Sequence, residues 1–238
     1  MAARESTGHF DNDADSMSDN RSACVAPRAV RDLWPRTDTD LGSVLGASEG
    51  MVDVRFRADG QWFFGLLELD FTEHQRRSVA GAGAVVSTGL LHALWMLPTQ
   101  FPVRPEQLPP IKAKRLRNAP AFCSESTEGF ERTYSPAGQI RALGVSGRRP
   151  QRTLDLTVQL SPIFRRLALV PPMTPGVRDR LSAGARSAGV GLAEEHLGGT
   201  ELVVPAPAAV RGRPGVYRWW MAELAYEAWL QESTQPVS

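Results

Sequence analysis

VDVRFRADGQWFFGLLELDF, residues 52–71, carries the clearest structural signal in this sequence. Apolar and charged residues alternate over residues 52–57, which is the pattern of a strand with one buried face. Residues 61–70 are almost uniformly apolar, which is typical of a strand that is covered on both faces. The two runs meet at Asp59 and Gly60, a dipeptide that favours a tight turn. The stretch therefore predicts an antiparallel hairpin.

The segments after the hairpin predict a mixed central sheet flanked by helices. A capping box at residues 72–75 begins a helix that is expected to cover residues 72–97. A second helix is expected over residues 174–188, with Pro175 in its first turn and Gly189 beyond its last residue. Runs with strand chemistry predict five further strands, over residues 130–134, 154–160, 167–170, 190–194 and 201–205. The fold class that follows is α/β or α+β.

The overall composition is that of an ordinary globular protein. The 238-residue chain is 42% hydrophobic and 22% charged, and its formal net charge of +1 gives no global argument for nucleic acid or a membrane as partner. Two cysteines form neither a disulfide framework nor a four-cysteine zinc site, which favours a cytoplasmic location. No apolar run approaches the roughly 20 residues that span a bilayer, and the N-terminus does not have the pattern of a secretory signal.

Composition along the chain sets the expected domain boundaries. Residues 1–26 are polar and acidic and cannot bury enough surface to order themselves, so they predict a disordered tail. Residues 27–238 are expected to form a single globular domain. The proline-rich segment 98–121 predicts a long surface loop, and it is the candidate boundary if there are two subdomains.

Three carboxylates lie at the open end of the predicted hairpin. Asp53 stands near the start of the first strand, roughly across from the Glu68 region of the second. Glu68 and Asp70 are two residues apart and project from one face. Hard oxygen ligands in this arrangement suit Mg²⁺ or Mn²⁺, which lowers the pKa of bound water and stabilises charge on a phosphate. The alternative interpretation is three solvated charges at strand ends.

This layout resembles the PD-(D/E)xK nuclease superfamily. In that family an Asp opens one strand, the next strand ends in Glu-x-Lys, and a helix follows. Asp53, then Glu68-Leu69-Asp70, then the capped helix follow the same order. The resemblance implies a metal-dependent endonuclease acting on nucleic acid, with Asp53, Glu68 and Asp70 as catalytic residues and metal ligands.

The sequence departs from the family pattern at two positions. Asp70 occupies the position of the catalytic lysine, and Val52 stands where the family has proline. Either the role of the lysine has moved to a residue such as Arg76 or Lys112, or the fold persists without cleavage. A catalytically degenerate domain that binds nucleic acid is therefore one form of this hypothesis.

Two basic segments are candidate phosphate-binding sites. KAKRLRN (residues 112–118) and GRRPQR (residues 147–152) both fall in predicted loops, where their cations can contact phosphates of DNA or RNA. A solvated surface is the alternative interpretation. The candidate nucleic-acid-binding residues are Lys112, Lys114, Arg115, Arg117, Arg148, Arg149 and Arg152.

The segment 214–231 predicts a helix with two apolar faces, separated by a narrow charged strip of Glu223 and Glu227. One face should pack on the domain. The other needs cover, either from the same core or from a partner chain. A non-catalytic interaction module that forms a homo-oligomer or binds a protein partner through this helix is therefore the alternative function. The two faces comprise Tyr217, Trp220, Met221, Leu224, Ala225 and Ala228 on one side and Trp219, Tyr226, Trp229 and Leu230 on the other.

The histidines do not show the spacing of a metal site. His74 and His92 fall in one predicted helix but are 18 residues apart, whereas paired zinc ligands on a helix are typically four apart. His196 lies between two glutamates and two glycines. A second acidic cluster is one interpretation of that stretch, and a polar turn is the simpler one, so no zinc site is predicted.

Overall fold

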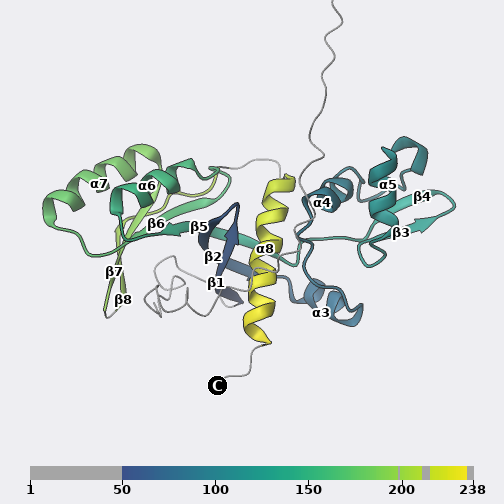
Figure 1. The fold of residues 1–238 in the computed structure, drawn as a ribbon, viewed down its shortest axis with the longest axis horizontal. Coiled ribbons are helices and arrows are strands. Elements are labelled where there is room, and N and C mark those ends of the chain that lie inside the picture. Colours follow the sequence, from purple (N-terminus) through teal and green to yellow (C-terminus); the bar gives the residue numbers. More distant parts are fainter. Residues whose placement is uncertain (1–49, 198, 211–214, 235–238) are drawn as a thin grey trace, which may run out of the picture. The chain divides into compact units, whose positions relative to one another are not determined.

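The predicted hairpin forms one edge of a six-stranded mixed sheet (Figure 1). The computed structural model describes residues 50–197, 199–210 and 215–234, and the tail expected over residues 1–26 lies outside them. In sheet order the strands are β1 (Met51–Ala58), β2 (Gln61–Leu69), β5 (Gly138–Ser146), β6 (Arg165–Val170), β7 (Gly191–His196) and β8 (Gly199–Val204). Strands β5, β6 and β7 are parallel, and the other pairs are antiparallel. The predicted mixed sheet with flanking helices is confirmed.

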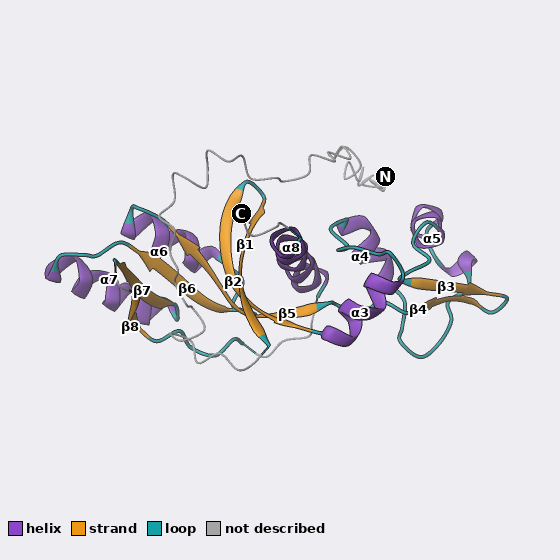
Figure 2. Cartoon of the chain, turned by 90° about the horizontal axis from the view of Figure 1, so that it is seen from below, coloured by secondary structure: helices purple, strands orange, loops and turns teal. Residues whose placement is uncertain are grey.

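Helices and a small second sheet complete the described part of the chain. The second sheet pairs two short strands and lies beside α5 in Figure 2. No helix within the described ranges is both long and apolar enough to cross a membrane. The remaining elements are α3 (Phe71–Val79), α4 (Thr88–Trp95), the 3₁₀ turn η1 (Pro105–Gln107), α5 (Pro110–Arg117), β3 (Cys123–Ser126), β4 (Gly129–Arg132), α6 (Pro150–Gln159), α7 (Pro175–Ala188) and α8 (Val216–Ser233).

The single helix predicted over residues 72–97 is wrong, because the chain forms two helices, α3 and α4, in this region. The alanine- and glycine-rich run between them has low helix propensity, and Gly81 adopts a left-handed backbone with φ of 62°. Ser87 then caps α4 by accepting a backbone N–H of its first turn. The start of α3 is also earlier than predicted, since Asp70 rather than Thr72 is its N-cap.

The strand predicted over residues 154–160 is wrong as well, because this segment belongs to helix α6. Leu154 and Thr157 are buried three residues apart, which is helical spacing. Pro150 lies in the first turn, where its fixed φ suits a helix. Strands β5 and β6 pair in parallel and therefore need a crossover connection, which α6 supplies. The apolar alternation over residues 154–160 predicted a strand, but Val158 is 39% exposed in α6, so the alternating positions do not form one buried face.

Strand β5 is absent from the sequence prediction although it lies in the sheet between β2 and β6. Its glycines, Gly138 and Gly144, lower its strand propensity. The loop predicted over residues 98–121 also contains a helix, α5, which begins at Pro110 in the first-turn position that favours proline. These residues lie in the same compact unit, Thr37–Ser238, as the sheet.

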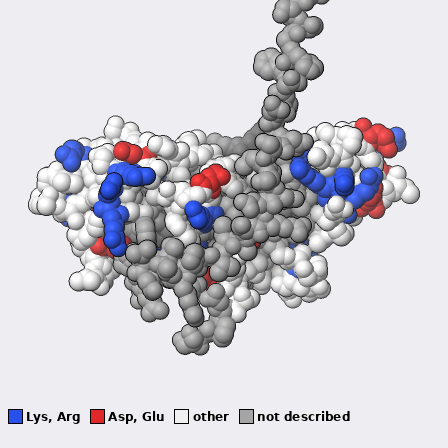
Figure 3. All heavy atoms as spheres, in the orientation of Figure 1, with Lys and Arg blue, Asp and Glu red and all other residues white. Residues whose placement is uncertain are grey.

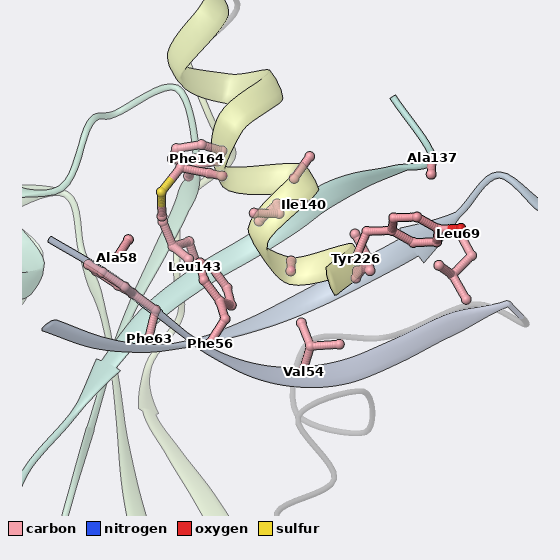
Figure 4. Packing of buried hydrophobic residues seen from close by; sticks show 14 of the residues in the cluster. Val54, Phe56, Ala58, Phe63, Leu69, Ala137, Ile140, Leu143, Phe164 and Tyr226 are labelled. Carbon is pink, nitrogen blue, oxygen red and sulfur yellow. The ribbon is translucent and has the colours of Figure 1, made fainter. Parts of the chain in front are cut away.

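Helix α8 packs between two apolar clusters, which cover most of both predicted faces, although Tyr217 near its start is 41% exposed. Figure 4 shows Tyr226 beside Leu69, and Ile140 and Leu143 of β5 belong to the same cluster. On its other side Trp219 is 8% exposed and packs in a cluster with residues of α4 and α5. In the view of Figure 2 the helix is seen nearly end-on between the β1–β2 hairpin and α4. The cover that the second face needs therefore comes from the same chain.

A buried ion network joins α3 to α8. The Arg77 side chain is fully buried, and its guanidinium donates to both carboxylate oxygens of Glu223, each at 2.8 Å. Glu73 binds the same guanidinium at 2.8 Å, and Glu223 also accepts from the Tyr134 hydroxyl at 2.9 Å and from the Val85 amide at 2.7 Å. Glu223, which the sequence analysis placed in a narrow charged strip between two apolar faces, is buried and 1% exposed. Every group of this network has a protein partner, so its role is structural.

Candidate functional site

The three hairpin carboxylates lie at one end of the β1–β2 pair. Asp53 is opposite Leu66 and Glu68 is opposite Met51, so Asp53 and Glu68 are diagonal neighbours on one face. Asp70 follows the last residue of β2. Asp53 and Asp70 are exposed, and Glu68 is half-buried.

These carboxylates are already engaged within the protein. The Oδ1 atom of Asp70 accepts the Glu73 amide at 3.0 Å and so caps α3. The Arg141 guanidinium pairs with Oε2 of Glu68. Over the described ranges, Asp53, Glu68 and Asp70 do not form a group of three whose candidate ligand atoms all lie within 4.8 Å of one another. The arrangement does not fit a preformed Mg²⁺ or Mn²⁺ site, and the bound metal remains a prediction.

Glu68 and Asp70 nevertheless line one open hollow of about 570 Å³ with Gln139 and Arg141. A neighbouring hollow of about 490 Å³ shares Arg141 and adds Arg165. The Arg165 guanidinium donates to a backbone carbonyl at 3.0 Å, and Arg141 is held by Glu68. These hollows therefore combine carboxylates with cations that are already engaged, which suits neither a free metal site nor a strong anion site.

The second basic segment forms the amino end of α6. Arg149 is the N-cap of this helix, and its side chain makes no capping hydrogen bond. Arg148, Arg149 and Arg152 are exposed. The first amides of a helix have no intrahelical acceptor and carry the positive end of the helix dipole, so this end attracts anions. The segment also follows β5 directly, at the carboxyl edge of the parallel strands, where ligands of α/β sheets bind. The structure thus places the three arginines together at an anion-attracting position.

The first basic segment forms helix α5. Lys114 and Arg117 are exposed, and Arg117 pairs with Glu125 at 3.0 Å. Burial, together with the charge of Arg115, lowers the pKa of Lys112 below its usual value. In Figure 3 the cations of this face gather over α5 and, separately, over the region of α6. The segment is basic, but part of its charge is already balanced within the chain.

A different acidic group lies at the other end of the sheet. Over the described ranges, a single group of at least three potential metal-ligating side chains has all its ligand atoms within 4.8 Å of one another: Glu194, His196 and Glu201. Glu194 and Glu201 are register partners on β7 and β8. The sequence analysis noted Glu194 and His196 but missed Glu201. A signal for Glu201 was present, because the strands predicted over residues 190–194 and 201–205 could pair across the glycines between them.

The thiol of Cys123 is buried and held in its protonated form. Cys123 is 4% exposed, and burial, assisted by the Glu125 carboxylate, raises the pKa of its thiol to about 11. We therefore expect Cys123 to resist iodoacetamide at pH 8 in the native protein and to react after unfolding in urea, because only the thiolate attacks. Peptide mass spectrometry measures this difference. Rapid native labelling of Cys123 would contradict the buried, protonated thiol.

No protein-family model, curated protein or solved structure matches this chain. The comparisons therefore assign neither a family nor an activity. The functional argument consequently depends on the geometry and charge of the residues described above.

Proposed function

We propose that this chain is a catalytically degenerate, nuclease-like domain that binds the phosphate backbone of nucleic acid. The observation that carries the proposal is the amino end of α6, where three arginines of the first turn and the preceding residues are exposed and the N-cap side chain makes no capping hydrogen bond. Guanidinium groups bind phosphate oxygens in bidentate geometry, and the helix end adds amide donors and positive potential. Contacts of this kind give affinity without reading base sequence.

The mixed sheet is consistent with the nuclease-like part of the proposal, and the hairpin carboxylates support its degenerate part. Asp70 stands in the position of the catalytic lysine, and it caps α3. Glu68 is paired with Arg141. A metal at this end of the hairpin would have to compete with a guanidinium for Glu68, so binding rather than cleavage is the function that these contacts favour.

Binding is tested by fluorescence anisotropy with labelled duplex DNA, single-stranded DNA and single-stranded RNA over a range of salt concentrations. We expect Arg149→Ala/Arg152→Ala to weaken binding about tenfold or more and to reduce the slope of log affinity against log salt by about two. The matched control is Arg180→Ala/Arg186→Ala, which removes two exposed arginines from α7. Equal losses in both double variants, or no binding by the wild type, would overturn the proposal.

Cleavage is tested separately with supercoiled plasmid and single-stranded DNA in Mg²⁺ or Mn²⁺. We expect wild type and Glu68→Ala to show the same background, because the carboxylates do not converge and the lysine position is acidic. Cleavage by the wild type that is lost in Glu68→Ala would show an active metal site and would contradict the degenerate assignment. Because this assay does not use the α6 arginines, its result is independent of the binding result.

A further inference from the structure

The group formed by Glu194, His196 and Glu201 projects from one face of the antiparallel β7–β8 pair. Glu194 and His196 are two residues apart on β7, so their side chains leave the same face of the strand. Glu201 lies directly across from Glu194 on β8. Arg178, from the first turn of α7, contacts both glutamates. Three elements of the fold therefore fix the positions of these side chains.

The two glutamates divide their oxygens between two neighbours. The Oε1 atoms face Arg178, whose Nε lies 3.3 Å from Oε1 of Glu194 and whose Nη2 pairs with Oε1 of Glu201. The Oε2 atoms face His196, at 3.6 Å and 3.5 Å from its Nε2. These three atoms, two carboxylate oxygens and one imidazole nitrogen, thus point into a common space.

Two of the three separations, from Nε2 of His196 to the two Oε2 atoms, are close to those between the ligands of a tetrahedral metal. Two ligand atoms at about 2.1 Å from a tetrahedral Zn²⁺ lie about 3.4 Å apart. A histidine nitrogen with carboxylate oxygens is a ligand set that zinc accepts, and three protein ligands leave a fourth position open for water. Arg178 would remain on the Oε1 atoms, where it orients both carboxylates in the way that outer groups orient metal ligands.

The buried Glu194 carboxylate lies between Arg178 on its Oε1 side and His196 on its Oε2 side. Its side chain is only 3% exposed, and its Oε1 atom accepts no hydrogen bond, although Arg178 lies nearby. Buried carboxylate oxygens are normally satisfied, because leaving one without a partner is costly. A cation on the Oε2 side would add charge compensation to a buried carboxylate whose Oε1 atom is paired with Arg178 at 3.3 Å.

We propose that Glu194, His196 and Glu201 form a Zn²⁺ site on the β7–β8 pair. Glu194 is the buried anchor. His196 and Glu201 are 41% and 51% exposed, so the ion has an open route from solvent. The site is separate from the α6 arginines and from the hairpin carboxylates, and it does not depend on the proposed nucleic-acid binding.

Zinc binding is tested by isothermal titration calorimetry of tag-free full-length protein with ZnCl₂, in a Cys24→Ser background that removes the cysteine outside the described residues. We expect one Zn²⁺ per chain. His196→Ala should weaken binding by about 100-fold or more, since loss of a ligand exceeds the 10- to 100-fold effect of losing an outer group. The matched control is His92→Ala, which removes an exposed histidine of α4 and should leave the affinity unchanged.

Two further measurements keep the test decisive if His196→Ala is unstable. Glu201→Gln changes one exposed ligand without changing its size and should also weaken binding strongly. In the unmodified protein, Zn²⁺ should protect His196 but not His92 from diethyl pyrocarbonate, as mapped by peptide mass spectrometry. No zinc binding by the wild type, or binding and protection that are indifferent to these residues, would overturn the site and leave an ion-pair cluster of His196 with two carboxylates.

Discussion

Replacing Arg77 with alanine should destabilise the protein by about 3–5 kcal/mol, because the substitution leaves buried carboxylates without their cation. Glu223 is 1% exposed and Glu73 is 5% exposed, so water cannot readily replace the guanidinium. Small domains have a total stability of only about 5–15 kcal/mol. Urea unfolding, followed by far-ultraviolet circular dichroism, measures the change in the free energy of unfolding.

The shape of the Arg77 guanidinium matters as much as its charge. Burial disfavours the charged form, but the hydrogen bonds and charge of Glu223 outweigh it and raise the pKa of Arg77. Burial, with the Glu223 carboxylate, also raises the pKa of Tyr134, so its hydroxyl stays a donor to Glu223. Arg77→Lys should therefore recover only part of the lost stability, since an ammonium cannot reproduce the planar set of donors.

Arg117→Ala is the matched control for the buried network. Arg117 also pairs with a glutamate, Glu125, but the two side chains are 50% and 41% exposed. Exposed ion pairs contribute about 0–1 kcal/mol, so this substitution should have a small effect. Similar losses in Arg77→Ala and Arg117→Ala would mean that the Arg77 network is open to water, contrary to the structure.

The same network shows why the sequence could not reveal the whole core. Arg76 and Arg77 are adjacent and chemically identical, yet Arg76 is 37% exposed and Arg77 is fully buried. Which of them faces inward is set by how α3 packs against α8, where Glu223 accepts from the Arg77 guanidinium. Glu223 lies 146 residues further along the chain, so the sequence around α3 does not reveal this contact.

The sequence correctly predicted the elements whose faces and ends are marked by residues close together in the chain. The hairpin was predictable because alternation, an apolar run and an Asp-Gly turn all agree over one short stretch. Helix α7 was predictable because Pro175 and Gly189 mark its two ends. Strand β5 and helix α6 were not, since their conformations are set by the parallel pairing of β5 with β6, which is a contact between segments distant in the sequence.

The candidate sites show the same difference between features marked by neighbouring residues and features set by contacts between distant segments. Sequence alone picked out the arginines around α6 because they are close together in the chain, but it placed them in a loop. The helix end that makes them a candidate anion site appears only with the correct assignment of α6. Glu201 was missed because its relation to Glu194 is a cross-strand register, not a spacing along the chain. The hairpin carboxylates were spaced correctly for a metal, yet the caps and ion pairs that engage Glu68 and Asp70 cannot be read from spacing.

Gly144→Ala should destabilise the protein by about 3 kcal/mol, at the upper end of the usual cost of overpacking. A methyl group on Gly144 would lie 2.1 Å from Cζ of Phe64 and 2.3 Å from the carbonyl oxygen of Leu167. The phenyl ring can rotate away, but the carbonyl belongs to β6, so β5 and β6 would have to separate at the centre of the sheet. Thermal and urea unfolding measure the loss.

Gly184→Ala is the opposite case and controls for the glycine-to-alanine change itself. Gly184 lies within α7, and a methyl group there would meet Cδ2 of Leu154 at 3.6 Å, an ordinary contact. Alanine is favoured over glycine in a helix by about 0.5–1 kcal/mol, so this variant should be more stable than the wild type. If both alanines were equally well tolerated, β5 and β6 would have to lie farther apart than the structure places them. The carboxyl edge of the parallel strands would then have a different geometry. This edge holds the α6 arginines and the β7–β8 glutamates, and the parallel pairing of β5, β6 and β7 positions both groups.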